Sequence, residues 1–141
     1  MRILAIDFGE KRIGLALSDA LGITAQGLPT LFRQNMKQVL LDLAGTVKAH
    51  EVGEIIVGLP INMDGSHGKK AEEVHAFIPK LAHAAGVPVS AWDERLTSRE
   101  ASRFMIEADV SRKKQKEQSD RLAATLILQN YLEFKRSHSR S

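Results

Sequence analysis

The stretch that decides the fold is Ile3–Asp19, ILAIDFGEKRIGLALSD. Seven of its seventeen residues are Ile, Leu or Phe, and they fall into two apolar runs, 2–7 and 13–18. The short, glycine-containing connection between these runs predicts an antiparallel hairpin of core strands. Asp7 nevertheless places a carboxylate at the end of the first strand, and its presence there needs a chemical explanation.

The remainder of the chain alternates strand and helix patterns. After a third strand over about 23–32, the spacing of apolar residues predicts helices over 36–50, 67–85, 97–108 and 119–134, and strands over 54–58 and 87–92. The sequence therefore predicts an α/β fold with a five-stranded mixed sheet: three antiparallel strands, then parallel β–α units, with helices on both faces. In such sheets, functional groups gather beyond the carboxyl ends of the parallel strands.

Length and composition limit the classes of protein. The 141 residues suffice for one domain, expected over 1–136, with a short polar tail over 137–141. Cysteine is absent, which excludes disulfides and thiolate metal sites and fits a reducing compartment. Because no run of 18 apolar residues and no signal-peptide layout are present, we expect a cytoplasmic protein without a membrane partner.

Positive charge is concentrated at the C-terminal end. Residues 110–141 hold eight Lys or Arg against three Asp or Glu, whereas residues 1–109 hold 12 against 14. The polar segment over about 109–118 is expected to be mobile, and its cations are Arg112, Lys113, Lys114 and Lys116. Such a basic segment suits the phosphates of a nucleic acid, and a solvated surface is the alternative.

Three carboxylates could meet at one end of the sheet. Asp7 ends the first strand, Glu94 follows the strand over 87–92, and Asp120 lies in the first turn of the last helix, on its inward side. Converging carboxylates repel one another unless a cation lies between them, and ligands that are all oxygen favour one or two Mg²⁺ or Mn²⁺ ions. The alternatives are a turn cap for Asp7, pairing of Glu94 with Arg12 or Arg95, and a helix-dipole role for Asp120.

The opening stretch also resembles the phosphate-binding hairpin of actin-like ATPases and sugar kinases, through DFG followed by IGLALSD. Those proteins close two related domains around ATP, and 141 residues cannot supply both. A second DxG phosphate loop is missing as well. Length and motif content therefore disfavour this interpretation.

Over nearly its whole length the sequence resembles the YqgF/RuvX family of pre-16S rRNA nucleases, also described as Holliday-junction-resolvase-like proteins. The matching stretches are AIDFGEKRIGLALSD at 5–19, IIVGLPINMDGSHG at 55–68, WDERLTSREA at 92–101 and VSRKKQKEQSDRLAATLILQNYL at 110–132. The resemblance implies a ribonuclease-H-like fold and a metal-dependent nuclease with Asp7, Glu94 and Asp120 as its acids. A fourth acid, usual in RuvC-type sites, is replaced by Ala123 and Ala124, so a second metal ion is less supported than the first.

The function implied by the resemblance is phosphodiester hydrolysis, with the 5′ end of pre-16S rRNA as first substrate in ribosome biogenesis. Branched DNA is the second substrate, as for a Holliday junction resolvase in recombination and repair. A non-catalytic nucleic-acid-binding factor is the alternative from another class. The sequence leaves open RNA against DNA, the endonucleolytic or exonucleolytic mode, and whether the chain forms a homodimer.

Other side chains are candidates for contact with the substrate. Lys11, Arg12 and Arg95 could bind phosphates, and Asn62 could bind the scissile phosphate or serve only as a turn residue. The five histidines show no metal-ligand spacing and are interpreted as surface residues. Phe8, Trp92 and Tyr131 are expected in the core, so no base-stacking surface is predicted. The remaining singled-out residue, Thr97, is interpreted as a helix cap.

Overall fold

The computed structural model describes residues 1–62, 64–93 and 112–139; within the last range, side chains are described for 122–136. Five strands form one mixed sheet in the order β3-β2-β1-β4-β5. β1 (Arg2–Phe8), β2 (Arg12–Ser18) and β3 (Ala25–Phe32) are antiparallel neighbours. β4 (Val52–Leu59) lies parallel to β1, and β5 (Val89–Asp93) lies parallel to β4. The predicted sheet is confirmed.

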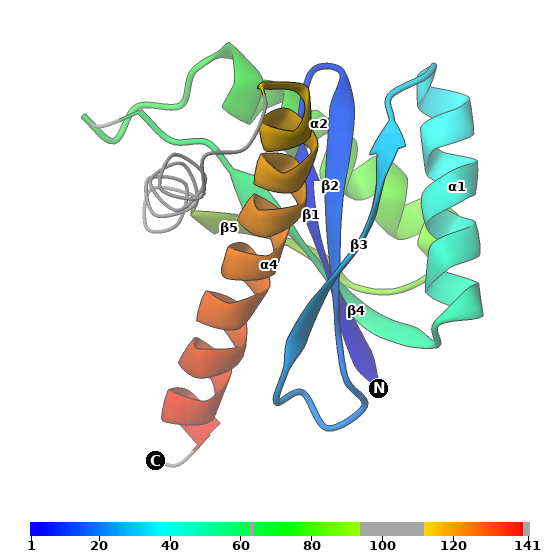
Figure 1. Ribbon diagram of the computed structural model, residues 1–141, viewed down its shortest axis with the longest axis vertical. Coiled ribbons are helices and arrows are strands. Elements are labelled where there is room, and N and C mark those ends of the chain that lie inside the picture. The colour runs from blue at the N-terminus through cyan, green and yellow to red at the C-terminus, as the bar shows by residue number, and fades with distance from the viewer. Residues whose placement is uncertain (63, 94–111, 140–141) are drawn as a thin grey trace.

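Helices cover both faces of this sheet (Figure 1). α1 (Met36–Ala49) and α2 (Lys69–Ala85) pack on one face, and α4 (Arg112–Ser139) packs on the other. Asn35, the residue directly before α1, caps this helix, because its side-chain oxygen accepts a hydrogen bond from the Gln38 backbone N–H at 2.9 Å. α2 continues without interruption past Pro79. It ends at Gly86, whose φ of 72° lies in the left-handed region.

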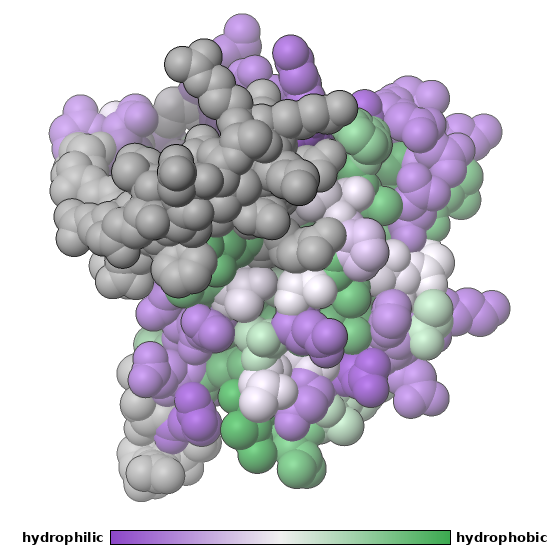
Figure 2. Space-filling view, in the orientation of Figure 1, coloured by the Kyte–Doolittle hydropathy of each residue, from purple (hydrophilic) through white to green (hydrophobic). Residues whose placement is uncertain are grey.

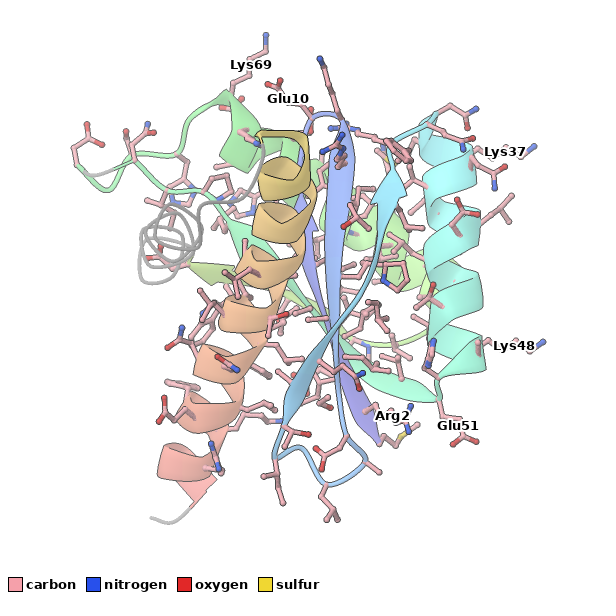
Figure 3. All side chains as sticks on the ribbon, in the orientation of Figure 1. Arg2, Glu10, Lys37, Lys48, Glu51 and Lys69 are labelled. Atoms are coloured by element: carbon pink, nitrogen blue, oxygen red, sulfur yellow. The ribbon has the colours of Figure 1, made fainter. Side chains whose placement is uncertain are left out.

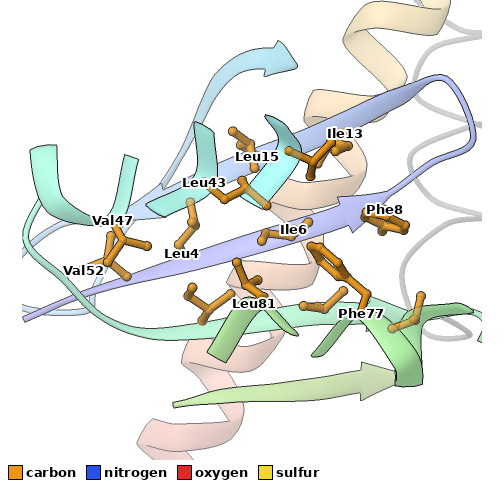
Figure 4. Close-up of a cluster of buried hydrophobic side chains, with 14 of the residues drawn as sticks. Leu4, Ile6, Phe8, Ile13, Leu15, Leu43, Val47, Val52, Phe77 and Leu81 are labelled. Carbon is orange, nitrogen blue, oxygen red and sulfur yellow. The ribbon is translucent and has the colours of Figure 1, made fainter. Parts of the chain in front are cut away.

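Alternation along β1 divides its side chains between two cores. Leu4, Ile6 and Phe8 belong to the core under α1 and α2 (Figure 4), whereas Ile3 and Ala5 belong to the smaller core under α4. Because side chains of a strand alternate between faces, Asp7 falls on the α4 face. The carboxylate is thus the next member of a row whose earlier members are buried against α4.

The last helix differs from the prediction at its start. The helix start expected at Ser119 is wrong, because α4 begins at Arg112 and residues 112–118 form its first two turns. The stretch RKKQKEQ was interpreted as a mobile segment for its polarity, but Arg, Lys, Gln and Glu are good helix formers and neither Gly nor Pro interrupts them. The predicted helix over 97–108 lies outside the described residues.

For the helix over 119–134 the spacing predicts that the inward face consists of Leu122, Leu126 or Ile127, Tyr131 and Phe134, and the observed face differs from it in part. The side chains buried against the sheet are Ala124, Ile127, Leu128 and Leu132. Phe134, expected to face inward, is 45% exposed. None of the helices in the described part of the chain combines the length and the apolar character needed to span a membrane.

Candidate active site

Asp7 lies between two positions that carry no side chain. It pairs with Gly14 on β2. Continuing the parallel register of β1 and β4 by one position brings Asp7 beside Gly58, and Gly58 pairs with Trp92 on β5. The half-buried carboxylate of Asp7 has no hydrogen-bond or ion-pair partner among the described side chains. This row therefore presents one carboxylate on the α4 face, between two glycines.

The hairpin turn beyond Asp7 depends on Gly9. The backbone N–H of Gly9 donates to the carbonyl oxygens of Asp7 and Arg12, at 3.1 and 3.0 Å. A Cβ at position 9 would collide with the carbonyl oxygen of Arg12. Only glycine fits there, so the turn stays tight and brings Lys11 and Arg12 to the end of the sheet that carries Asp7.

Arg33, directly after β3, contacts this turn. Its Nη1 donates to the carbonyl oxygen of Gly9 at 3.1 Å and to Glu73 Oε1 of α2 at 2.8 Å. The guanidinium carbon lies 4.3 Å from the ring centroid of Phe8, and Phe8 stacks on Phe77 at 4.2 Å. Sequence reasoning missed Arg33, although a cation directly after the third strand, at the same end of the sheet as the hairpin turn, was a usable signal.

The loop after β4 is closed by its own hydrogen bonds. Asn62 donates from Nδ2 to Ser66 Oγ at 3.1 Å, and its backbone N–H donates to the Ser66 carbonyl at 3.0 Å. The Ser66 hydroxyl and backbone N–H both donate to Asp64 Oδ1, which lowers the pKa of the Asp64 carboxyl. The structure thus places Asn62 as a turn residue, and its predicted contact with a phosphate stays a prediction.

Several features gather at one end of the molecule. Figure 1 shows the β1–β2 turn and the first turns of α2 and α4 at the same end. Figure 3 shows Glu10 of the turn and Lys69 of α2 at that end. Helix N-termini and Lys69 favour anions at this end, whereas Glu10 opposes them.

The interpretation of the histidines as surface residues leaves out a contact between two of them. His67 and His75 are exposed, as predicted, but their rings stack with centroids 5.3 Å apart. Their facing nitrogens, Nδ1 of His67 and Nε2 of His75, lie 3.2 Å apart. The pair connects the loop after β4 to α2. Among the described side chains, no group of three His, Cys, Asp or Glu residues could hold a metal ion.

The other predicted acids are described in part or not at all. Glu94 and Arg95 lie outside the described residues. Asp120 has a described helical backbone, one turn before the buried Ala124, but its side chain lies outside the description. The same holds for the predicted basic contacts Arg112, Lys113, Lys114 and Lys116. Since α4 contacts β1 and β2, the structure brings the helix that carries Asp120 onto the sheet face that carries Asp7.

Trp92 of β5 is the last residue of the row that runs from Gly14 through Asp7 and Gly58 across the sheet. Its ring is half-buried and meets Tyr131 and Phe134 edge-on, each with centroids 5.4 Å apart. The hydroxyl of Tyr131 in turn donates to a carboxylate oxygen of Glu54 on β4. The predictions that Phe8, Trp92 and Tyr131 pack in the core are confirmed, fully for Phe8 and in part for the other two.

Solved structures identify the fold. The chain superposes on Thermus thermophilus RuvC in complex with a Holliday junction substrate with a TM-score of 0.60, at 15% identity, covering 97% of this chain and 96% of that one. It superposes on the fowlpox virus Holliday junction resolvase with a TM-score of 0.55, at 15% identity, covering 95% and 99%. These likenesses show the ribonuclease-H-like fold.

Sequence comparison identifies the family. The model of the family described as "RuvX: Holliday junction resolvase" matches residues 1–134. A protein of Halothermothrix orenii is 50% identical over 134 residues, which cover 95% of this chain and 96% of its own. One of Myxococcus xanthus is 47% identical over 136 residues, covering 96% and 90%; both carry the name "Putative pre-16S rRNA nuclease". The chain belongs to the RuvX family of nucleases, which confirms the resemblance of the four motifs.

Proposed function

We propose that this protein is a metal-dependent nuclease that processes the 5′ end of pre-16S rRNA. Its family and the name of its relatives support hydrolysis of phosphodiester bonds in this precursor. The observation that carries the proposal is Asp7, a half-buried carboxylate between Gly14 and Gly58 with no partner among the described side chains. A half-buried carboxylate without a partner suits a cation.

We assign Asp7, Glu94 and Asp120 to hold this cation. Glu94 lies two positions after Trp92, and the period of a continued β5 would bring it to the α4 face. Asp120 lies one helical turn before Ala124, which is buried against that face. Oxygen ligands alone suit Mg²⁺ or Mn²⁺, and such an ion, when bound, supplies charge stabilisation at the scissile phosphate. Without a fourth acid beside Asp120, one ion is favoured over two.

The basic residues would hold the substrate in place. Lys11 sits in the turn beyond Asp7, Arg12 begins β2 directly after that turn, and Arg95 adjoins Glu94 in the sequence. The cations over 112–116 at the start of α4 would follow the phosphate backbone, which orients the nucleic acid without reading its sequence. Asn62 would contribute through its side-chain oxygen, since its Nδ2 donates to Ser66.

The proposal includes the setting of the enzyme. We propose that a single domain over 1–136 acts in the cytoplasm, where precursor rRNA is found, and the family match over 1–134 supports that extent. Structured RNA is the first partner and branched DNA the second. A homodimer is part of the hypothesis, and light scattering of the purified chain tests it.

A second candidate, a Holliday junction resolvase, has its own support in the description of the family and in the fold shared with junction-bound RuvC. The test compares RNA carrying a 16S precursor 5′ extension with a four-way DNA junction, each with Mg²⁺ or Mn²⁺. We expect faster cutting of the RNA. Faster, symmetric cutting of the junction would favour the resolvase, and folded protein that cuts neither would favour a non-catalytic binding factor.

A further inference from the structure

Phe32 is an exposed aromatic ring at the end of an edge strand. It is 66% exposed, whereas Phe8 and Phe77 are 2% and 1% exposed in the core. Phe134, at 45% exposed, has Trp92 as an aromatic neighbour. Isolated apolar side chains are common on protein surfaces, so the surroundings of Phe32 decide whether it has a use.

The sheet register places Phe32 on the same face as Asp7. Phe32 pairs with Arg12 and Leu31 pairs with Ile13. Ile13 belongs to the core under α1 and α2, so Arg12 and Phe32 fall on the opposite, α4 face. Two strand spacings and two residues separate Phe32 from Asp7, which puts their Cα atoms about 12 Å apart. A ring at that distance can contact a nucleotide close to a phosphate held at Asp7.

One cation lies beside this ring, and a second lies in the adjoining turn. The guanidinium carbon of Arg12 lies 5.6 Å from the centroid of Phe32. Arg12 Nη1 is buried and has no hydrogen-bond partner in the described part of the chain. Lys11 is exposed in the adjoining turn, and its carbonyl accepts from the backbone N–H of Arg33 at 2.9 Å. Because Arg12 Nη1 is buried, Arg12 supports the ring, and the exposed Lys11 is the cation within reach of a phosphate. The exposed ring and this lysine match what single-stranded nucleic acid needs, a stacking partner for the base and a partner for the phosphate.

We propose that Phe32 and Arg12 form a stacking platform for an unpaired base of the nucleic acid substrate. The platform rests on the proposed nuclease function and narrows it, because the substrate must then carry unpaired nucleotides next to the bond that is cut. A base inside a continuous duplex stacks on its own neighbours and offers no free face to Phe32. The sequence analysis predicted no stacking surface; the missed signal was an aromatic residue at the end of an edge strand, paired across from an arginine.

The test measures binding without a divalent metal, so that no cutting intervenes. An RNA hairpin with a single-stranded 5′ extension is compared with a blunt RNA hairpin of the same length. We expect wild type to prefer the extended RNA, and Phe32→Ala to weaken that binding by about 5- to 100-fold, the range of base–aromatic stacking. Binding of the blunt hairpin should stay within about twofold. Phe32→Trp should retain the preference, and Phe32→Leu, apolar but unable to stack, should lose it.

The matched control is Leu21→Ala. Leu21 is 80% exposed in the β2–β3 loop, where Figure 2 shows hydrophobic surface at the opposite end of the molecule from the turn. Its removal should change neither affinity. In a further test, a single abasic nucleotide is placed at successive positions of the 5′ extension. At one position it should abolish the preference of wild type for the extended RNA. At that position it should not weaken the binding of Phe32→Ala any further.

Two results would overturn the platform: unchanged binding of the extended RNA by Phe32→Ala, or equal weakening for both RNAs. The same samples are then given Mn²⁺. Cutting by wild type with no role for Phe32 contradicts the platform and leaves the nuclease standing. A Phe32-dependent preference without any cutting supports the platform and contradicts the proposed nuclease.

Discussion

Asp7 shows how a single residue acquires its setting from the whole sheet. Its own strand positions it by alternation, since Ile3 and Ala5 precede it on the α4 face. Its neighbours across the sheet are Gly14 and Gly58, which come from separate strands. The alternation is readable in the sequence, and with it the face of Asp7. The two glycines become neighbours of Asp7 only through the register, so this setting of the carboxylate was not predictable.

At the residue scale, Asp120→Asn tests whether a second acid joins Asp7. If the carboxylates converge, removing one charge relieves repulsion, and we expect the metal-free variant to be as stable as wild type or more stable by about 1 kcal/mol. Mg²⁺ or Mn²⁺ should raise the melting temperature of wild type, and the variant should lose most of that rise. If Asp120 only complements the helix dipole, Asn should instead cost about 0.3–1 kcal/mol and leave the metal response intact.

The Tyr131 hydroxyl leads to a prediction of how the stability of the protein depends on pH. Burial and the hydrogen bond to Glu54 raise the pKa of the Tyr131 hydroxyl above its ordinary value. The folded protein therefore keeps the phenolic proton where the unfolded chain loses it. The stability gained is complete below a pH of about 10, the ordinary pKa of tyrosine, and is lost as pH rises above it. Chemical unfolding should show a steeper fall from about pH 10 to 12 for wild type than for Tyr131→Phe.

Below pH 9 the Tyr131→Phe variant should be less stable by about 1 kcal/mol, the net contribution of one hydrogen bond at a half-exposed site. Glu54→Gln serves as the partner control, because it keeps an oxygen acceptor and removes the charge that raises the pKa. Identical pH profiles for wild type and Tyr131→Phe would show that the hydroxyl does not titrate differently in the folded state.

At the scale of elements, α4 is the part of the fold that sequence reasoning described least well. Its inward face was found in part, since Ile127 is buried as predicted, but its start was placed seven residues late. The high charge of residues 112–118 favoured a mobile segment in the prediction, although the same residues have high helix propensity. Its connection to the sheet was also invisible in the sequence. Glu54 of β4 accepts from Tyr131 and pairs with Lys135 at 3.0 Å, residues about 80 positions away along the chain.

Because residues 112–118 are helical, the prediction that the cations over 112–116 bind phosphates becomes more specific. Residues of an α-helix are about 100° apart, so positions 112, 113 and 116 fall within one arc of about 100° and position 114 lies on the other side. If the arc faces a duplex, replacing its three cations by Gln should reduce the log–log salt slope of binding by about 3. Gln keeps the helix propensity. Lys114→Gln alone should change the slope least, and an equal effect of all four single variants would contradict one-sided contact.

At the scale of the whole molecule, the sequence predicted the five-stranded mixed sheet, the helices on both of its faces and the family. Patterns of apolar residues are local and survive in a single sequence, which explains that success. What was missed lies in contacts between distant segments: Arg33 against Phe8 and Glu73, and Phe32 opposite Arg12. Such contacts depend on register and chain crossing, which no local pattern contains.

The central claim is that Asp7 makes this fold a metal-dependent nuclease, and Asp7→Asn tests it most directly. Both proteins are given RNA with the 16S precursor 5′ extension and Mn²⁺, and the initial rate of cutting is measured. Since a metal ion supplies several kcal/mol of transition-state stabilisation, we expect the variant to cut at least about a hundredfold more slowly. RNA binding and the metal-free melting temperature should stay at or above wild-type values. Cutting by Asp7→Asn at the wild-type rate would contradict the account.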